Sequence, residues 1–252
     1  MLRETTIEKL YEMKLGVMAR TFNEQCKDNN YHTIAFKERL GMMVDAEWTT
    51  RKNNRLMRLI KGADYAIGGA CIEDIEYRAD RNLDKTQIQR LASCEYINEH
   101  YNVVILGATG SGKTYLSNAL GLAASRKFYT VKYVRLPDFL ADLHIARGDG
   151  TYRRVINKYK AVSLLIFDEW LLFALKDYEA RDILEIVEAR HKRASTIFCS
   201  QFQIDGWHDK IGETTTADAI VDRIIHDSYT VTIGGLDSMR KHKGLKLTDG
   251  KD

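Results

Sequence analysis

Residues 107–114, with the sequence GATGSGKT, constrain the possible folds of this chain more than any other stretch. They follow the apolar run NVVIL and precede YLSNALGLAAS, whose composition favours a helix. This arrangement matches the pattern G-x-x-x-x-G-K-[ST] between a buried strand and a helix. Because glycines let backbone N–H groups approach phosphate oxygens closely, we interpret the stretch as a phosphate-binding loop rather than a glycine-rich structural turn.

The residues of this loop have different expected roles. Lys113 is expected to reach the β and γ phosphates of ATP, and the Thr114 hydroxyl to bind Mg²⁺. The rest of the loop is expected to surround the phosphates; it consists of Gly107, Ala108, Thr109, Gly110, Ser111 and Gly112. The sequence thus predicts ATP and Mg²⁺ as the cofactors.

Strand-like and helical segments alternate after residue 102. Strands are predicted at residues 103–106, 130–136, 161–167 and 195–201. Helices are predicted after Lys113, from the sole proline, Pro137, onward, and at residues 180–193. This alternation predicts an α/β domain with a parallel sheet and helices on both of its faces.

The first ninety-five residues have a different pattern. Their apolar residues recur at helical spacing, and the pattern Thr5-x-x-Glu8 predicts a capping box for the first helix. No strand-like run occurs before Val103. We therefore predict a helical N-terminal domain over residues 1–95 and a nucleotide-binding domain over residues 96–252.

Composition excludes several classes of function. The four cysteines form no C-x-x-C pair, which argues against a zinc site or a disulfide framework and favours a reducing, cytoplasmic setting. No signal peptide is recognisable, and no apolar run approaches the roughly 20 residues that span a bilayer, so no membrane partner is expected. The formal net charge of +3 is too small to indicate a partner by itself.

Two further strand ends carry candidate catalytic groups. In AVSLLIFDEW, Asp168 ends an apolar strand and is expected to complete the Mg²⁺ site, while Glu169 is expected to polarise the attacking water. This pair favours an ATPase over a kinase, which has no hydrolytic water to activate. In STIFCSQ, Ser200 and Gln201 are expected beside the acidic pair, and the longer Gln201 side chain is the better candidate to sense the γ phosphate.

Two arginines are candidates for the transferred phosphate. Arg223 lies on a short amphipathic segment, DAIVDRIIHDS, and Arg240 lies in GLDSMRKHK. An arginine contributes most to phosphoryl transfer when it approaches from another subunit or from a closing segment. The alternative is that both are ordinary surface or ion-paired arginines.

Taken together and in order, these segments resemble the IstB-like ATPases, which are ATP-binding helper proteins encoded beside the transposase of bacterial insertion sequences. The resemblance rests on the phosphate loop, LLIFDEW, STIFCSQFQIDGWHDKIGE, TTTADAIVDRIIHDSYTV and SMRK, and it extends into the N-terminal segments LYEMKLGVMARTFNEQ, FKERLGMMVDAEWTTRKNNRLMRLIKGA and IEDIEYRADRNLDKTQIQRLAS. It implies an AAA+ core similar to that of helicase loaders and the initiator DnaA. It also implies self-assembly into a homo-oligomer on DNA and a partnership with a transposase.

The chain departs from the family pattern at two positions. Many relatives have Asp-Asp where this chain has Asp168-Glu169, a change that keeps a carboxylate and is expected to preserve hydrolysis. AAA+ proteins usually carry a second sensor arginine on a helical lid, which the short segment around Arg240 is not expected to form. A nucleotide-sensing role for Arg240 is therefore in question.

A basic run supplies the candidate contacts to double-stranded DNA. Between Thr49 and Lys61 there is no acidic residue, and positions 51, 55 and 58 fall on one helical face. The candidates are Arg51, Lys52, Arg55, Arg58 and Lys61. We expect phosphate contacts without base reading, because no recognition motif accompanies the run; the alternative is a solvated charged face. Tyr152, Arg153 and Arg154 form a second basic candidate.

The sequence leaves alternative functions open. A DnaC-like replicative helicase loader has the same site chemistry and differs in its partner. A nucleotide-dependent scaffold that does not hydrolyse ATP differs in its turnover.

Overall fold

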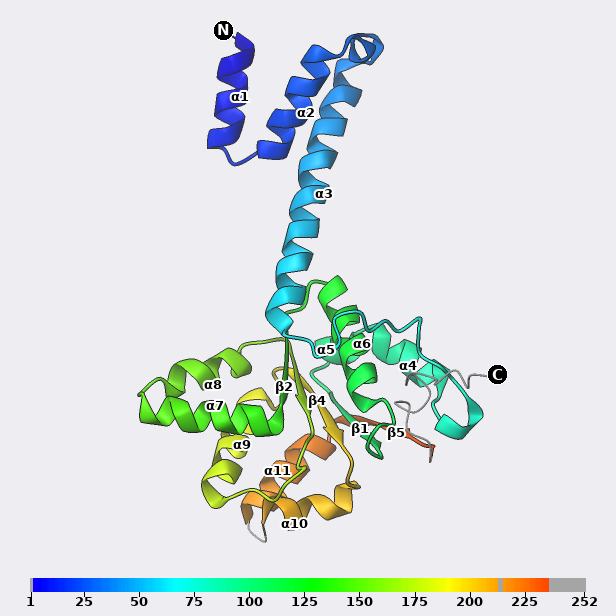
Figure 1. The fold of residues 1–252 in the computed structure, drawn as a ribbon, viewed down its shortest axis with the longest axis vertical. Helices are drawn as coiled ribbons and strands as arrows, with labels where there is room; N and C mark the ends of the chain where they lie inside the picture. The colour runs from blue at the N-terminus through cyan, green and yellow to red at the C-terminus, as the bar shows by residue number, and fades with distance from the viewer. Residues whose placement is uncertain (1, 213–214, 236–252) are drawn as a thin grey trace, which may run out of the picture. The chain divides into compact units, whose positions relative to one another are not determined.

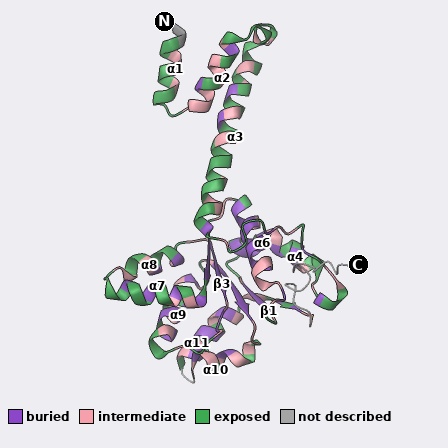
Figure 2. Ribbon diagram, in the orientation of Figure 1, coloured by how far each residue is buried: buried purple, intermediate pink, exposed green. Residues whose placement is uncertain are grey.

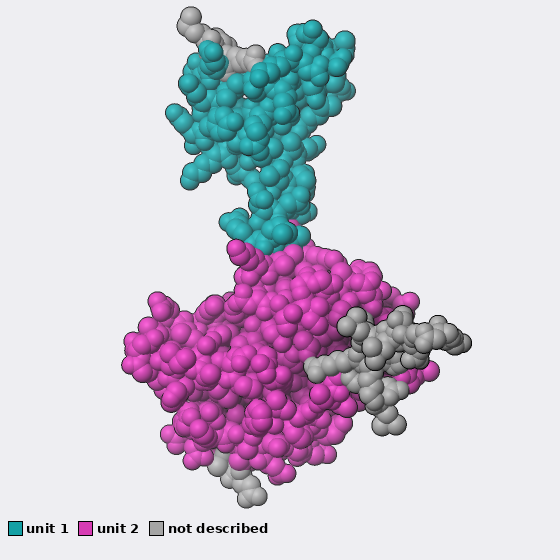
Figure 3. All heavy atoms as spheres, in the orientation of Figure 1, with its two compact units in different colours: residues 1–58 teal, residues 59–252 magenta. Residues whose placement is uncertain are grey.

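This computed structural model describes residues 2–212 and 215–235. Contacts within the chain divide it into two units, residues 1–58 and residues 59–252, which Figure 3 shows in different colours. Residues 59–95, which the sequence analysis grouped with the N-terminal helices, are in the same unit as the phosphate-binding loop. Among the described helices, none is both long and apolar enough to cross a membrane.

The first unit consists of helices, as its apolar spacing predicts. They are α1 (Leu2–Glu12), α2 (Gly16–Lys27), the 3-10 helix η1 (Asn29–Thr33) and the main part of α3 (Phe36–Ala63). The Glu47 carboxylate of α3 accepts hydrogen bonds from the N–H groups of Val17 and Met18, both at 2.9 Å, and so caps the start of α2. The predicted capping box at Thr5 is wrong, because α1 begins at Leu2 and Thr5 lies inside it.

Five parallel strands form the sheet of the second unit, in the order β2-β3-β4-β1-β5 (Figure 1). The strands are β1 (Asn102–Gly107), β2 (Val131–Arg135), β3 (Leu164–Asp168), β4 (Ser195–Ser200) and β5 (Ser228–Ile233). The helices are η2 (Ala79–Arg81), α4 (Lys85–Ala92), α5 (Glu95–Asn98), α6 (Lys113–Arg126), α7 (Leu136–Gly148), α8 (Tyr152–Lys160), α9 (Asp177–Arg190), η3 (Ile204–Gly206), α10 (Trp207–Ile211) and α11 (Thr215–Ile225). The predicted parallel α/β architecture is confirmed, and Pro137 lies in the first turn of α7 as expected.

Helices cover both faces of this sheet, which explains why its central strands are buried on both faces along nearly their whole length. On β1, Val104 and Leu106 pack in a core with α7, α8, α9 and α11, whereas Val103 and Ile105 pack on the other face with α4, α5 and α6. In Figure 2 these strands are buried. The sequence analysis missed β5, an edge strand that pairs with β1 along its whole length.

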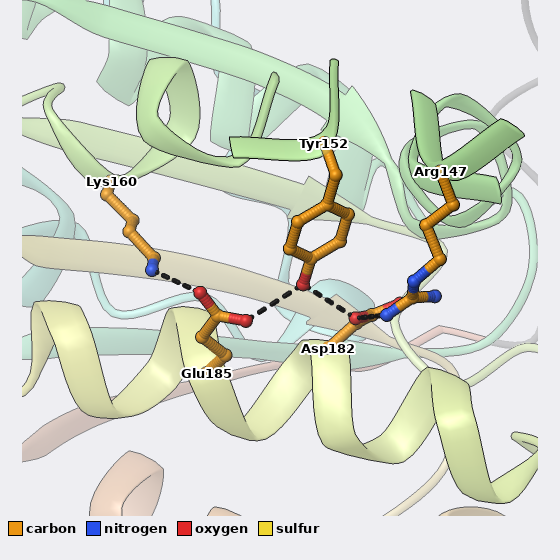
Figure 4. Close-up of polar contacts among 5 residues, drawn as sticks. All are labelled: Arg147, Tyr152, Lys160, Asp182 and Glu185. Atoms are coloured by element: carbon orange, nitrogen blue, oxygen red, sulfur yellow. Dashed lines mark hydrogen bonds and ion pairs between the residues drawn. The ribbon is translucent and has the colours of Figure 1, made fainter. Parts of the chain in front are cut away.

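A polar network joins α7 and α8 to α9 (Figure 4). The Tyr152 hydroxyl lies 2.8 Å from a carboxylate oxygen of Asp182 and 2.8 Å from one of Glu185, and its single proton is shared between them. Arg147 forms an ion pair with the buried Asp182, and Lys160 donates to Glu185 at 2.7 Å. The network holds Tyr152 against the fold, so this residue has a structural role, while Arg153 and Arg154 beside it are exposed.

The two ends of β1 lie against different parts of the second unit. Its carboxyl end, Gly107, opens the phosphate-binding loop. Its first residue, Asn102, donates from its side-chain amide to the carbonyl oxygen of Ile224, at 3.2 Å, near the end of α11. The loop therefore lies at the carboxyl ends of the strands, and the end of α11 lies at their amino ends.

Candidate functional site

The predicted phosphate-binding loop connects β1 to α6, as the motif requires. Gly110 and Gly112 have φ angles of +80° and +101°, a region that disfavours residues with a Cβ atom. The Lys113 ammonium donates to the carbonyl oxygens of Gly107 at 2.7 Å and Ala108 at 2.9 Å, so the side chain folds back over the loop. Burial lowers the pKa of Lys113, and a bound phosphate would favour its charged form.

Asp168 at the end of β3 reaches the loop directly. Its Oδ2 atom accepts hydrogen bonds from the Thr114 hydroxyl at 2.6 Å and from the Tyr133 hydroxyl at 2.8 Å. The side chain is buried, and Tyr133 comes from the neighbouring strand β2. Sequence reasoning missed Tyr133, because a tyrosine inside a buried strand normally indicates packing alone.

These oxygen atoms suit a magnesium ion. Mg²⁺ prefers oxygen ligands and usually takes only one or two from the protein, with the rest from phosphates and water. The Thr114 hydroxyl and the Asp168 carboxylate provide such a pair, already in contact with each other. No cluster of three or more His, Cys, Asp or Glu residues suited to a metal occurs in the part of the chain that the structure describes.

Glu169 has a different environment from Asp168. Its Oε2 atom forms an ion pair with Arg135 at 2.6 Å, and its side chain is one-third exposed. Its φ angle is +53°, which is uncommon for a residue other than glycine and turns the chain sharply after β3. Arg135 ends β2 directly opposite Asp168 in the sheet. The candidate base is therefore held by a cation, which the sequence analysis did not predict.

The end of β4 connects to the loop through Gln201. The Gln201 Oε1 atom accepts a hydrogen bond from the Thr109 hydroxyl at 2.7 Å, which places this side chain at the phosphate-binding loop. The Ser200 hydroxyl instead donates to the carbonyl oxygen of Trp170 at 3.2 Å, and the residue is fully buried. Of the two residues, Gln201 is the one whose side chain contacts the loop.

A cavity of about 420 Å³ opens beside the loop. One wall consists of Gly110, Lys113 and Thr114. The other consists of residues upstream of β1, including Ile75, Arg81 and Leu83. This wall also contains the carboxylates of Asp74 and Glu76, while its apolar side chains are suited to contact a nucleoside. The sequence analysis missed the wall because this segment has no motif.

Arg223 lies away from this cavity, near the amino ends of the strands. It forms an ion pair with Glu188 of α9 at 3.1 Å and also donates to the carbonyl oxygen of Ala219 at 2.9 Å. The six residues of β1 separate the amino ends of the strands from the carboxyl ends by about 17 Å. An arginine at this position cannot reach the phosphate-binding loop of its own chain. Arg240 lies outside the described residues.

The five candidate DNA-binding residues of the basic run all lie on α3 and are exposed. Several of them make contacts that the sequence did not indicate, and the Arg58 Nε atom donates to the carbonyl oxygen of Asn54 at 3.3 Å. Arg51 forms an ion pair with Glu47 at 2.6 Å and also contacts the carbonyl oxygen of Lys14, and Lys52 lies over the Trp48 ring at 4.6 Å. A phosphate would therefore have to compete with Glu47 for Arg51.

Solved structures share the fold of most of this chain. Similarity covers 75% of this chain and 59% of DnaA from Aquifex aeolicus bound to AMPPCP, with a TM-score of 0.59 and 22% identity. A crystal structure of DnaI matches over 70% of this chain and 93% of its own, with a TM-score of 0.58 and 19% identity. These likenesses confirm the predicted AAA+ P-loop fold.

Sequence comparisons identify the family. A putative insertion sequence ATP-binding protein, y4pL, of Sinorhizobium fredii is 37% identical over 98% of this chain and 100% of its own length. The putative ATP-binding protein of insertion sequence IS1162 from Pseudomonas fluorescens is 39% identical over 80% of this chain and 87% of its own. The family model for the IstB-like ATP binding protein matches residues 8–246. The chain therefore belongs to the IstB-like ATP-binding protein family.

Proposed function

We propose that this protein is an ATPase that assembles on double-stranded DNA and acts with the transposase of its insertion sequence. The observation that carries the ATPase proposal is the direct hydrogen bond between Thr114 and Asp168, with Gln201 bonded to the same loop. Three strand ends thereby bring a phosphate loop, a magnesium ligand pair and a polar sensor to one edge of the sheet. The names of the relatives support ATP as the nucleotide and an insertion sequence as the context.

We propose a role for each side chain that its position supports. Lys113 and the loop N–H groups bind the phosphates, and Thr114 and Asp168 would hold Mg²⁺, which neutralises phosphate charge when bound. Glu169 accepts a proton from the attacking water once it leaves Arg135. Gln201 orients the γ phosphate or that water. ATP turnover measured with and without duplex DNA tests this assignment against a scaffold that does not hydrolyse ATP.

Replacing Glu169 with glutamine keeps the size of the side chain and removes its basicity. We expect ATP binding to persist and turnover to fall by roughly 100-fold or more, because a positioned general base contributes about 10²–10⁴ in rate. A phosphate-release assay beside an equilibrium ATP-binding measurement separates the two effects.

Asp138→Asn is the matched control, because Asp138 is an exposed carboxylate that contacts the same Arg135 at 3.6 Å. Its turnover should stay within about twofold of the wild-type value, as usual for a surface substitution. Unchanged turnover in Glu169→Gln would show that another group activates the water.

The exposed basic residues of α3 are proposed to contact the DNA backbone. Changing Arg51, Arg55 and Arg58 together to alanine should weaken duplex binding equally across sequences. The slope of log K against log salt concentration should flatten by roughly 0.9 for each phosphate that the variant no longer neutralises. Fluorescence anisotropy on two unrelated duplexes over a salt series measures both quantities.

A parallel variant has Arg153, Arg154 and Lys158 changed to alanine. Its DNA affinity shows whether a second exposed basic face, on α8, contributes to binding. Glu47→Gln releases Arg51 from its ion pair and should strengthen binding slightly. If only the α8 variant binds DNA more weakly, the DNA surface lies on α8 and the α3 residues form a solvated face.

The helicase-loader alternative shares every feature of the nucleotide site and predicts a different partner. A pull-down with a transposase of an insertion sequence that encodes this protein, compared with a replicative helicase, distinguishes the two. Capture of the helicase alone would refute the transposition role while leaving the ATPase assignment intact.

A further inference from the structure

Arg81 lies against the phosphate-binding loop although it is thirty residues away from Ser111 in the chain. It ends η2 and is 6% exposed. Its Nη2 atom donates to the carbonyl oxygen of Ser111 at 3.1 Å. A Cβ atom built on Gly112 would lie 2.9 Å from the same Nη2 atom, so the guanidinium packs directly on the loop.

The hydrogen-bond partners of this guanidinium are uncharged. Its Nη1 atom donates to the backbone carbonyl of Glu76 at 2.8 Å, and its Nε atom is buried without a partner among the described residues. In the part of the chain that the structure describes, no carboxylate lies within ion-pair distance of Arg81; Asp80, its neighbour, is paired with Arg78 at 3.4 Å.

A buried cation without a counterion is costly for a protein. Burial lowers the pKa of Arg81, an effect that the nearby Glu76 charge opposes, yet an arginine stays protonated at neutral pH. Glu76 and Asp80 act on this charge from beyond ion-pair distance, so a bound anion can supply the direct counterion that the described residues do not provide.

The cavity beside the loop indicates which ligand supplies it. Arg81 lines this cavity together with Gly110, Lys113 and Thr114, the residues proposed to surround the phosphates. We propose that Arg81 is a second cation of the nucleotide site, which the bound polyphosphate neutralises and which favours nucleotides with more phosphate groups. This inference rests on the proposed assignment of residues 107–114 to nucleotide binding.

Arg81 also has a backbone contact that any test must separate from its charge. The N–H group of Gly234, just after β5, donates to the Arg81 carbonyl oxygen at 2.7 Å. A purely structural role predicts that a substitution weakens the binding of every nucleotide by the same factor. An electrostatic role predicts reductions in affinity that increase with the number of phosphate groups.

The experiment compares ATP, ADP and AMP binding to wild type, Arg81→Gln and Arg81→Lys by calorimetry. Arg81→Gln should lose about tenfold more affinity for ATP than for AMP, with ADP between them, since each added phosphate charge interacts with the missing cation. Arg81→Lys should retain the wild-type order and most of the affinity. Arg126→Met is the control. It removes an exposed cation at the end of α6, which is paired with Glu73 at 3.8 Å, and it should change none of the ratios.

Thermal unfolding without nucleotide establishes that each variant is folded, and Arg81→Met replaces Arg81→Gln if the latter is not. An equal reduction for all three nucleotides, or a reduction in Arg81→Lys as large as in Arg81→Gln, overturns the inference and leaves the ATPase proposal standing. Failure of the wild-type protein to bind any of the three nucleotides would instead refute the proposed function itself.

Discussion

Replacing Lys113 with alanine is expected to abolish ATP binding at ordinary nucleotide concentrations. The Lys113 amine lies over the phosphate-binding loop, within 2.9 Å of two of its carbonyl oxygens, and is proposed to contact two phosphates. A hydrogen bond to a charged group contributes about 1.5–3 kcal/mol, so removing two such bonds lowers affinity by roughly 100-fold or more. Equilibrium binding of a fluorescent ATP analogue measures this change.

Lys127→Ala is the matched control, because Lys127 follows the other end of α6 and donates to the carbonyl oxygen of Ser93. This variant should bind ATP with wild-type affinity. Normal ATP affinity in Lys113→Ala would refute the assignment of the loop and, with it, every assembly step that is proposed to depend on bound nucleotide.

The sequence predicted those parts of the site that a local pattern determines. The loop at residues 107–114 is contiguous, and its glycines occupy backbone conformations that restrict the choice of residue. Asp168 and Gln201 were placed near each other because the carboxyl ends of neighbouring parallel strands share one edge of the sheet. Both inferences need only the order of the elements.

The parts that were missed depend on contacts between distant segments. Arg81 reaches the loop from a segment without regular periodicity, and Arg135 holds Glu169 through a pairing between strands β2 and β3. No spacing rule connects these residues in the sequence. Strand β5 was missed because it is an edge strand in which only Val231 and Ile233 are buried, so its apolar pattern is too short to stand out in the sequence.

Arg223 is predicted to act on the nucleotide of a neighbouring subunit, and Arg223→Ala is expected to bind ATP normally and hydrolyse it poorly. The end of α11 lies at the amino ends of the strands, whereas the loop lies at their carboxyl ends. Arg223 therefore does not reach the nucleotide of its own chain. Arginines supplied from a partner raise phosphoryl-transfer rates by about 10³–10⁵ in other nucleotide hydrolases. A decrease in this range, measured by phosphate release at saturating ATP, is the expected result.

Glu188→Gln provides the matched control for this residue. Glu188 holds Arg223 at 3.1 Å within the chain, and this ion pair must open before the guanidinium contacts a phosphate. Removing the carboxylate should therefore leave turnover unchanged or raise it. A decrease in Glu188→Gln as large as that in Arg223→Ala would indicate that the ion pair is structural and that its rupture explains both variants.

Mixing variants tests whether the arginine acts across a subunit boundary. A Lys113→Ala subunit cannot bind ATP but still presents Arg223 to an Arg223→Ala neighbour whose loop is intact, so the mixture should recover part of the activity that each variant lacks alone. Because this rescue requires a nucleotide-free subunit to enter the assembly, Glu169→Gln, which is expected to bind ATP, serves as a second donor of Arg223. If neither donor restores turnover while both variants assemble on DNA, Arg223 does not act between subunits, and assembly is not what gates hydrolysis.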